Sequence, residues 1–238
     1  MCGRFTLTTN DYESVAAALD ADWDPQDAAL YRPRFNVAPT DRCPIVVAGA
    51  GGRRKLGWAT WGLVMPRDRD KPKPPVQINA RAETVATRGF FRNALLRIRC
   101  AVVADGFYEW VGPKQARKPI RFHREDGALI GLAGIALPWR HPESGEQITR
   151  FAIVTTTPNR LIAGAHDRMP AMLEGAELDA WLDAPPPDLD QQRWLDRLVG
   201  YLHPASDDAL VATAASPRAN DVRNDDPGVL FDEQPSLL

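Results

Sequence analysis

The chain has 238 residues, of which 44% are hydrophobic and 25% charged, and its formal net charge is −2. This composition is ordinary for a globular protein, and no apolar run approaches the roughly 20 residues that cross a bilayer, which argues against a membrane protein. The first residues lack an apolar signal segment, so we expect a reducing, cytoplasmic location. Three cysteines without CxxC spacing argue against a disulfide framework and a zinc site, and we expect no metal and no cofactor.

The charge is distributed unevenly along the chain. Residues 31–125 carry 20 Lys and Arg against 7 Asp and Glu, whereas residues 126–238 carry 8 against 18. Arginine dominates the basic side, with 24 Arg to 5 Lys. Because Arg makes bidentate phosphate contacts and stacks on bases, the basic half is compatible with a nucleic-acid surface. Ion pairing on a solvated surface explains the same composition equally well.

The predicted elements, in chain order, begin with an amphipathic helix over residues 10–20, capped by Asn10. Short β-type runs separated by Gly, Pro and Asp clusters follow at Ile45–Ala48, Gly57–Leu63, Val76–Ala80, Ala101–Ala104, Ile120–Phe122, Leu129–Ala136 and Arg150–Thr156. Helical patterns lie at Phe90–Arg99, Gly175–Leu182 and Leu189–Leu202. Because strands outnumber helices and do not alternate regularly with them, we predict an α+β fold with a curved antiparallel or mixed sheet.

Two segments have the composition of surface chain. Residues 66–75 combine several charges with prolines between two β-type runs, which predicts an exposed loop. The chain from Asp225 onward is acidic and contains Pro227 and Pro235, so we expect it to be poorly ordered. We therefore predict one domain over residues 1–224 and a disordered acidic tail over residues 225–238.

Cys2 is the first candidate for chemistry. A small residue at position 2 permits removal of Met1, which would leave a thiol and an α-amine on adjacent carbons. Their reference pKa values are about 8.5 and about 7.7–8.0, so both can act as nucleophiles near neutrality. Toward an aldehyde, the amine forms a Schiff base and the thiol closes a five-membered thiazolidine. The alternative is that Cys2 is only a small residue near the start of a strand.

Two internal stretches carry polar groups among apolar ones. In residues 79–84, polar side chains alternate, which places Asn79, Arg81 and Glu83 on one face of a strand, suited either to solvent or to a phosphate site. Glu109 is a lone acid between two aromatic residues, directly after the apolar run Ala101–Ala104. Apolar surroundings raise a carboxyl pKa and allow proton transfer near neutral pH, although a surface position at a strand end is the simpler alternative.

His166 is one of only four histidines and lies close to Arg168. Histidine titrates near physiological pH and suits proton transfer to a sugar oxygen, but a lone histidine is more often structural. Residues 36–40 read as a tight turn, and Trp61 begins an aromatic strand end. One interpretation is that these segments are only a turn and part of the core; the other is that both line a groove.

Taken together, these stretches resemble the SRAP family, the SOS-response-associated peptidase fold whose members sense abasic sites. They occur in the family's order over nearly the whole chain, at Cys2–Phe5, Asn36–Thr40, Trp61–Leu63, Asn79–Thr84, Ala104–Trp110 and His166–Pro170. The resemblance implies a barrel-like central sheet with peripheral helices. It also implies abasic sites in single-stranded or junction DNA as the partner, and we expect a monomer that associates with the nucleoid when bound to DNA.

The resemblance further implies roles for individual residues. Cys2 would be the crosslinking nucleophile, Asn79 would position the sugar-derived adduct, Glu109 would assist at the N-terminal amine, and His166 would act as acid and base in opening the deoxyribose ring. An autopeptidase activity would remove Met1. The expected DNA contacts are Arg4, Asn36, Pro39, Thr40, Trp61, Arg81 and Arg168.

The chain departs from the family pattern in two places. The family usually has a second tryptophan shortly after the Trp-Gly-Leu of residues 61–63, and this chain has Val64, Met65, Pro66, Arg67 and Asp68 there. Base stacking contributes roughly 1–3 kcal/mol per base, so the change bears on affinity and junction preference rather than on Cys2. Val103 replaces a usual proline, which we expect to alter packing only.

Two other classes of function compete with this interpretation. A cysteine-type peptidase acting on proteins would need an oxyanion hole, and the sequence has no signature for one. A non-enzymatic module could instead bind single-stranded DNA through strand shape alone.

Overall fold

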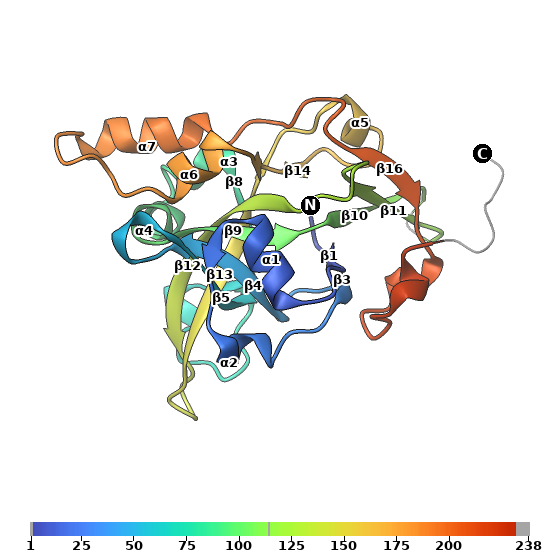
Figure 1. Cartoon of the computed structure of the whole chain (residues 1–238), viewed down its shortest axis with the longest axis horizontal. Coiled ribbons are helices and arrows are strands. Elements are labelled where there is room, and N and C mark those ends of the chain that lie inside the picture. Colours follow the sequence, from blue (N-terminus) through green and yellow to red (C-terminus); the bar gives the residue numbers. More distant parts are fainter. Residues whose placement is uncertain (1, 114, 232–238) are drawn as a thin grey trace.

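The computed structural model describes residues 2–113 and 115–231 (Figure 1). Its strands are β1 (Phe5–Leu7), β2 (Ala21–Asp22), β3 (Arg34–Val37), β4 (Arg42–Ala48), β5 (Arg54–Trp61), β6 (Leu63–Val64), β7 (Val76–Gln77), β8 (Asn79–Arg81), β9 (Arg99–Ala104), β10 (Gly106–Val111), β11 (Lys118–His123), β12 (Ile130–Arg140), β13 (Gln147–Thr156), β14 (Met169–Pro170), β15 (Met172–Leu173) and β16 (Val211–Ala214).

The helices lie around these strands. The α-helices are α1 (Tyr12–Ala18), α2 (Pro25–Ala28), α3 (Ala82–Val85), α4 (Gly89–Arg97), α5 (Arg160–Ala163), α6 (Ala176–Leu182) and α7 (Gln191–Gly200). The 3-10 helices are η1 (Ala50–Gly52), η2 (Pro66–Asp68), η3 (Pro217–Asn220) and η4 (Pro227–Val229). Among the described residues, no helix is both long and apolar enough to cross a membrane.

A ring of strands forms the centre of the molecule. The order β13-β12-β9-β4-β5 is antiparallel throughout, and β5 then pairs in parallel with β13, which closes the ring. A second sheet has the order β16-β11-β10-β1-β3. The prediction of a single α+β fold with a barrel-like, largely antiparallel sheet and peripheral helices is therefore confirmed.

The barrel is buried on both faces. In β9, Cys100 and Val102 belong to one core cluster, whereas Ala101 and Val103 belong to another that also contains residues of α1, α4, α6 and α7. Successive strand residues point to opposite faces, so a strand with a core on each side must be apolar throughout. This explains why the continuous apolar run at Ala101–Ala104 predicts its strand correctly.

The second sheet brings the N-terminal segment against the barrel. β1 lies between β10 and β3, with Phe5 opposite both Phe107 and Val37. The rings of Phe5 and Trp61 lie 5.2 Å apart, which joins this sheet to strand β5 of the barrel. Cys2 lies three residues before the start of β1 and belongs to the same core cluster as these aromatic residues.

Three local predictions need correction. The cap of α1 is Asp11 rather than Asn10, because the Asp11 carboxylate accepts a hydrogen bond from the Ser14 amide. The strand expected over residues 79–84 ends at Arg81, where α3 begins, so Glu83 lies on a helix. The turn predicted at residues 36–40 begins later, since β3 runs through Val37.

The tail prediction also needs correction over residues 225–231. The Asp225 carboxylate accepts hydrogen bonds from the amides of Phe35 and Asn36 at 2.7 and 2.9 Å and pairs with Arg34. η4 follows, and Val229 is fully buried. An acidic composition did not produce disorder here because the carboxylate has specific donors on β3. Residues 232–238 of the predicted tail lie outside the described residues.

Candidate active site

Cys2 lies at the end of the barrel core and is fully buried. Its carbonyl oxygen accepts a hydrogen bond from Asn79 Nδ2 at 2.9 Å. Burial raises the pKa of the Cys2 thiol, and the negative charge of Glu109 raises it further. The thiol is therefore protonated at neutral pH, and any reaction at sulfur needs a group that accepts its proton.

Glu109 is placed by strand alternation in β10. It shares its face with Phe107, which belongs to the Cys2 core cluster, whereas Tyr108 and Trp110 face the smaller cluster around η3 and η4. Only 3% of Glu109 is exposed. Burial raises its pKa to about 7. A carboxyl group with this pKa exchanges protons at physiological pH, which is the property expected of a general acid or base.

Asn79 reaches the site from another part of the chain. Its strand, β8, pairs in parallel with β13, with Asn79 opposite Ile153. The Asn79 amide donates to Cys2, but its Oδ1 is buried and has no hydrogen-bond partner within the described residues. A buried acceptor without a donor costs about 1–3 kcal/mol, so this oxygen is suited to receive a hydrogen bond from a ligand.

His166 follows α5 and is partly buried. Its Nδ1 lies 3.0 Å from the Arg168 amide nitrogen and 2.8 Å from Asp167 Oδ1. Since a backbone N–H can only donate, Nδ1 accepts from Arg168 in the neutral ring, and the proton is then on Nε2. Burial, the largest effect, lowers the pKa of His166; the carboxylate of Asp167 beside Nδ1 opposes this, and the positive charge of Arg117 adds to it. The neutral ring is thus favoured.

The same two charged residues act on Glu109 and His166. Asp167 raises and Arg117 lowers the pKa of Glu109, after the larger effect of burial. Both also act on the pKa of His166. The fold therefore brings Cys2, Glu109 and His166 into one electrostatic neighbourhood, together with Asn79.

Three of the predicted DNA contacts, Arg81, Thr40 and Pro39, are at least partly exposed to solvent. Arg81 is exposed at the end of β8, and among the described residues no hydrogen bond or ion pair engages its guanidinium. Thr40 is exposed and Pro39 half-buried in the turn between β3 and β4. Thr40 has φ 77°, and its amide donates to the Trp61 carbonyl at 2.9 Å, which holds the turn against β5.

Arg4 and Asn36 instead hold the chain's own C-terminal segment. Arg4 donates to Asn36 Oδ1 at 2.7 Å and to the Ala219 carbonyl at 2.9 Å, and its guanidinium lies over the Trp110 ring. Asn36 is fully buried and donates to the carbonyls of Asp221 and Asn224. Asn36 therefore has no surface that could touch DNA, and Arg4 is half-buried with its Nε inaccessible to solvent.

Trp61 and Arg168 are also occupied within the fold. Trp61 is fully buried, stacks on Phe151 and donates from Nε1 to the Ile78 carbonyl, so its ring cannot stack on a base. Arg168 is 8% exposed and pairs through both terminal nitrogens with the Glu83 carboxylate. The geometry assigns these two side chains to the scaffold rather than to DNA contact.

Sequence reasoning missed Arg117, which lies in the connection between β10 and β11. In a hairpin the second strand runs back beside the first, and Lys118 pairs with Val111, so a basic residue just before β11 was a usable signal. A buried Asp105 was also missed: it accepts from the Thr8 hydroxyl at 2.6 Å and pairs with Arg121 at 3.0 Å, tying β1 to β10 and β11.

The arrangement thus offers a thiol, a carboxyl group of pKa about 7, a neutral imidazole and an amide, all beside the N-terminal segment. Such a set can move protons around an attack by nitrogen or sulfur. Among residues 2–113 and 115–231, no three His, Cys, Asp or Glu side chains are grouped as they would be to hold a metal ion.

The chain is similar to known proteins over nearly its full length. The abasic site processing protein YoqW of Bacillus subtilis (strain 168) is 33% identical over 232 residues, covering 97% of this chain and 99% of that protein. The abasic site processing protein YedK of Escherichia coli (strain K12) is 32% identical over 188 residues, covering 76% and 79%.

Solved structures share the fold. A protein from Bacteroides thetaiotaomicron superposes with a TM-score of 0.81 at 22% identity, covering 98% of this chain and 100% of that one. A protein from Bordetella bronchiseptica superposes with a TM-score of 0.71 at 26% identity, covering 90% and 100%. The model of the family described as SOS response associated peptidase (SRAP) matches residues 1–222. The chain therefore belongs to the SOS response associated peptidase (SRAP) family.

Proposed function

We propose that this protein processes abasic sites in single-stranded DNA by forming a covalent thiazolidine crosslink through Cys2 after removal of Met1. The observation that carries the proposal is the convergence of Asn79, Glu109 and His166 on the Cys2 segment from separate parts of the chain. The names of the relatives, abasic site processing proteins, give the substrate class.

The reaction begins at the α-amine of Cys2. The neutral amine attacks the open-chain aldehyde of the abasic site, and loss of one water gives a Schiff base. The thiol sulfur then bonds to the imine carbon, the C=N double bond becomes a single bond, and the thiol proton ends on nitrogen. The only leaving molecule is water, and no oxidant or reductant is needed. Ring closure removes the imine that would otherwise promote β-elimination and strand cleavage.

Glu109 and His166 supply the proton transfers. Because burial raises the pKa of the Cys2 thiol, a thiolate is not available in advance, and a nearby base must take the proton as sulfur attacks. Glu109, with a pKa of about 7, is suited to accept protons from the amine and the thiol and to return them. The neutral His166 ring is suited to assist opening of the deoxyribose ring to the aldehyde.

Asn79 and Arg81 position the strand. The unpaired Asn79 Oδ1 can accept from a hydroxyl of the opened sugar while its Nδ2 holds the Cys2 carbonyl. Arg81 lies two residues further along β8 with an exposed guanidinium, where it can meet a phosphate. Phosphate contacts position a strand without reading its sequence, so crosslinking should not depend on the flanking bases.

Removal of Met1 is the step on which the chemistry depends. An amide nitrogen is not nucleophilic and has too few protons to form an imine, so Cys2 must become the amino terminus. We propose that the same Glu109 carboxyl assists this cleavage as an autopeptidase step. A Glu109→Gln protein would then retain Met1 in intact-mass measurements, whereas cleavage by a host aminopeptidase would leave Glu109→Gln processed like the wild type.

A denaturing gel tests the proposal against its rivals. The purified protein is mixed with abasic and intact oligonucleotides of identical sequence. The proposal predicts a heat-stable shifted band with the abasic strand alone. No covalent band with either strand, together with equal non-covalent binding, would favour a DNA-binding module. Cleavage of an added protein, with no covalent DNA band, would favour a cysteine peptidase.

A further inference from the structure

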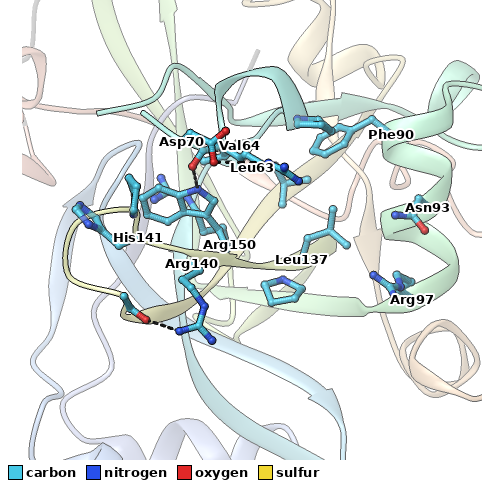
Figure 2. A pocket seen from close by; sticks show the side chains of 16 residues that line it. Leu63, Val64, Asp70, Phe90, Asn93, Arg97, Leu137, Arg140, His141 and Arg150 are labelled. Atoms are coloured by element: carbon cyan, nitrogen blue, oxygen red, sulfur yellow. Dashed lines mark hydrogen bonds and ion pairs between the residues drawn. The ribbon is translucent and has the colours of Figure 1, made fainter. Parts of the chain in front are cut away.

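A cavity of about 590 Å³ lies away from Cys2, between β6 and η2, the helix α4, and the β12–β13 hairpin. Figure 2 shows Asn93 and Arg97 of α4 on one side of it and Leu137 and Arg140 of β12 on the other. Cys2, Asn79, Glu109 and His166 do not line it. Its volume falls within the range of about 300–1,000 Å³ that is typical of small-molecule sites.

Arg150 is the unusual residue of this cavity. It is only 7% exposed, its Nε donates to the Gly62 carbonyl at 2.6 Å, and its guanidinium lies 5.1 Å from the centre of the Trp139 ring. No carboxylate among the described residues pairs with it, and burial lowers its pKa. Buried arginines normally have a carboxylate or a row of carbonyl acceptors, because an uncompensated charge is costly.

Another buried arginine shows the difference. Arg99, 8% exposed, donates from all three nitrogens to the carbonyls of Trp181, Leu95 and Asp183. Its hydrogen-bonding capacity is thus used by the protein. For Arg150 the structure gives one backbone acceptor, at Nε, and its two terminal nitrogens have no acceptor among the described residues. Arg150 therefore has donors left for a ligand that lies in the cavity.

The remaining lining adds positive charge and an apolar wall. Arg69, Arg97 and Arg140 all line the cavity, and Asp70 is its one acidic lining residue, 3.6 Å from Arg69. Trp139 is held by a hydrogen bond from its Nε1 to the Arg69 carbonyl. The apolar side chains of the lining are Leu63, Val64, Phe90, Leu137 and Trp139, with Pro66, Pro138 and Pro142.

We propose that this cavity is a second ligand site, which binds a nucleoside phosphate with the phosphate at Arg150 and the base against the apolar wall, while Arg97 adds positive charge from the α4 side. A fork of N–H donors matches phosphate oxygens, and an anion would supply the counter-charge that Arg150 lacks. A bare inorganic anion would leave the apolar wall exposed to water. The site is independent of the Cys2 chemistry, and the nucleotide can be either free or one unit of a DNA strand.

The test uses full-length protein carrying Cys2→Ala, so that no covalent reaction contributes. Calorimetric titrations compare dAMP, deoxyadenosine, inorganic phosphate and an intact single-stranded oligonucleotide. We expect dAMP or the oligonucleotide to bind, and to bind more tightly than inorganic phosphate, while deoxyadenosine does not bind. Binding of dAMP identifies a free nucleotide as a sufficient ligand. Binding of the oligonucleotide alone identifies a unit of a strand, provided that the variants below weaken it.

Variants locate the binding in this cavity. Arg150→Met and Arg97→Gln should each weaken binding about 10- to 100-fold, the loss expected for a charged hydrogen bond. Arg193→Gln is the matched control, since Arg193 is an exposed arginine of α7 outside the cavity. If Arg150→Met lowers the melting temperature too far, Arg97→Gln decides alone, because Arg97 is exposed. Equal binding by Arg97→Gln and the control, equal binding of deoxyadenosine and dAMP, or no binding of either nucleotide ligand at millimolar concentration overturns the proposal.

Discussion

The Cys2 site and the Arg150 cavity place their polar groups in opposite ways. Around Cys2, a thiol and a carboxyl group are buried, and both pKa values are raised. Around Arg150, four arginines place permanent positive charge beside a cavity of about 590 Å³, and its lining contains no cysteine, serine or threonine. Burial brings the pKa of Glu109 to about 7, which suits proton transfer, whereas fixed charge beside open volume suits binding of an anion. The first arrangement fits a reaction and the second fits recognition.

Cys2→Ala should have the largest effect, because it removes the nucleophile of the reactive region only. We expect complete loss of heat-stable crosslinking to abasic single-stranded DNA, with non-covalent binding nearly unchanged. Cys43→Ala and Cys100→Ala are the matched controls: both thiols are buried in the same core cluster as Cys2. They should crosslink normally and cost about 0.5–3 kcal/mol of stability. A full borohydride-independent adduct from Cys2→Ala would contradict the thiazolidine mechanism.

In protein whose Met1 has been removed enzymatically, so that the Cys2 amine is free, Glu109→Gln should slow crosslinking by about 10²–10⁴-fold, the usual contribution of a general acid or base. Because the carboxylate is the working base and its pKa is about 7, the wild-type rate should rise as pH increases through 7. The rate of the Gln protein should not rise through pH 7 and should change only near pH 8, where the α-amine loses its proton. A gel time course between pH 5.5 and 8.5 measures this. Identical pH profiles would remove Glu109 from the reaction.

The same variant should change stability in a pH-dependent way. The folded Glu109 pKa is raised above its unfolded value, so between pH 4.5 and 7 the folded state binds more protons than the unfolded state. The contribution of Glu109 to the stability of the wild type therefore falls as pH rises through this window. Glu109→Gln should not show this pH-dependent loss of stability. Its free energy of unfolding minus that of the wild type, measured by urea unfolding, should therefore be more positive at pH 8 than at pH 5. A constant difference would indicate an ordinary carboxyl pKa.

His166→Gln should slow both formation and reversal of the crosslink, with affinity for an intact strand unchanged. We expect an effect near the low end of the acid–base range, about 10²-fold, since ring opening also proceeds without a catalyst. The pKa of His166 is lowered, so the wild type should lose this contribution only below about pH 6.5. Equal rates for the two proteins from pH 5.5 to 8.5 would make this histidine structural.

Arg81→Ala should have the smallest effect and act on binding alone. Intact and abasic strands should both bind up to about five-fold more weakly, since an exposed ion pair contributes roughly 0.2–1 kcal/mol. Loss of one phosphate contact should reduce the slope of log affinity against log salt by about 0.7. Arg193→Gln on α7 serves as the control. An unchanged slope would show that Arg81 touches no phosphate.

The sequence predicted the barrel better than the second sheet, for a physical reason. Strands buried on both faces, such as β9, are continuous apolar runs that local pattern detects. β10 carries Glu109 on the face of the core, and this acid breaks the apolar pattern of its strand. β1 and β3 have only 3 and 4 residues and are specified by pairing with each other rather than by composition.

The sequence indicated which residue types form the site, but not which of the predicted side chains are exposed. The contact between Asn79 and Cys2 spans 77 positions, and the pair of Arg168 with Glu83 spans 85. No local pattern shows whether an arginine has such a distant partner, which is why Arg168 looked available for DNA. The burial of Trp61 is equally invisible to local pattern, because it depends on contacts with Phe5 and Phe151 from other strands.

Intact-mass spectrometry of the protein after incubation with an abasic oligonucleotide shows whether Cys2, as the amino terminus, forms the crosslink. We expect the free protein to lack Met1 and the adduct to have the summed masses of protein and DNA minus one water. Peptide mapping should place the modification on Cys2, stable without reduction. An adduct on protein that retains Met1, or a modification mapped to a lysine, would rule out thiazolidine formation at an N-terminal Cys2.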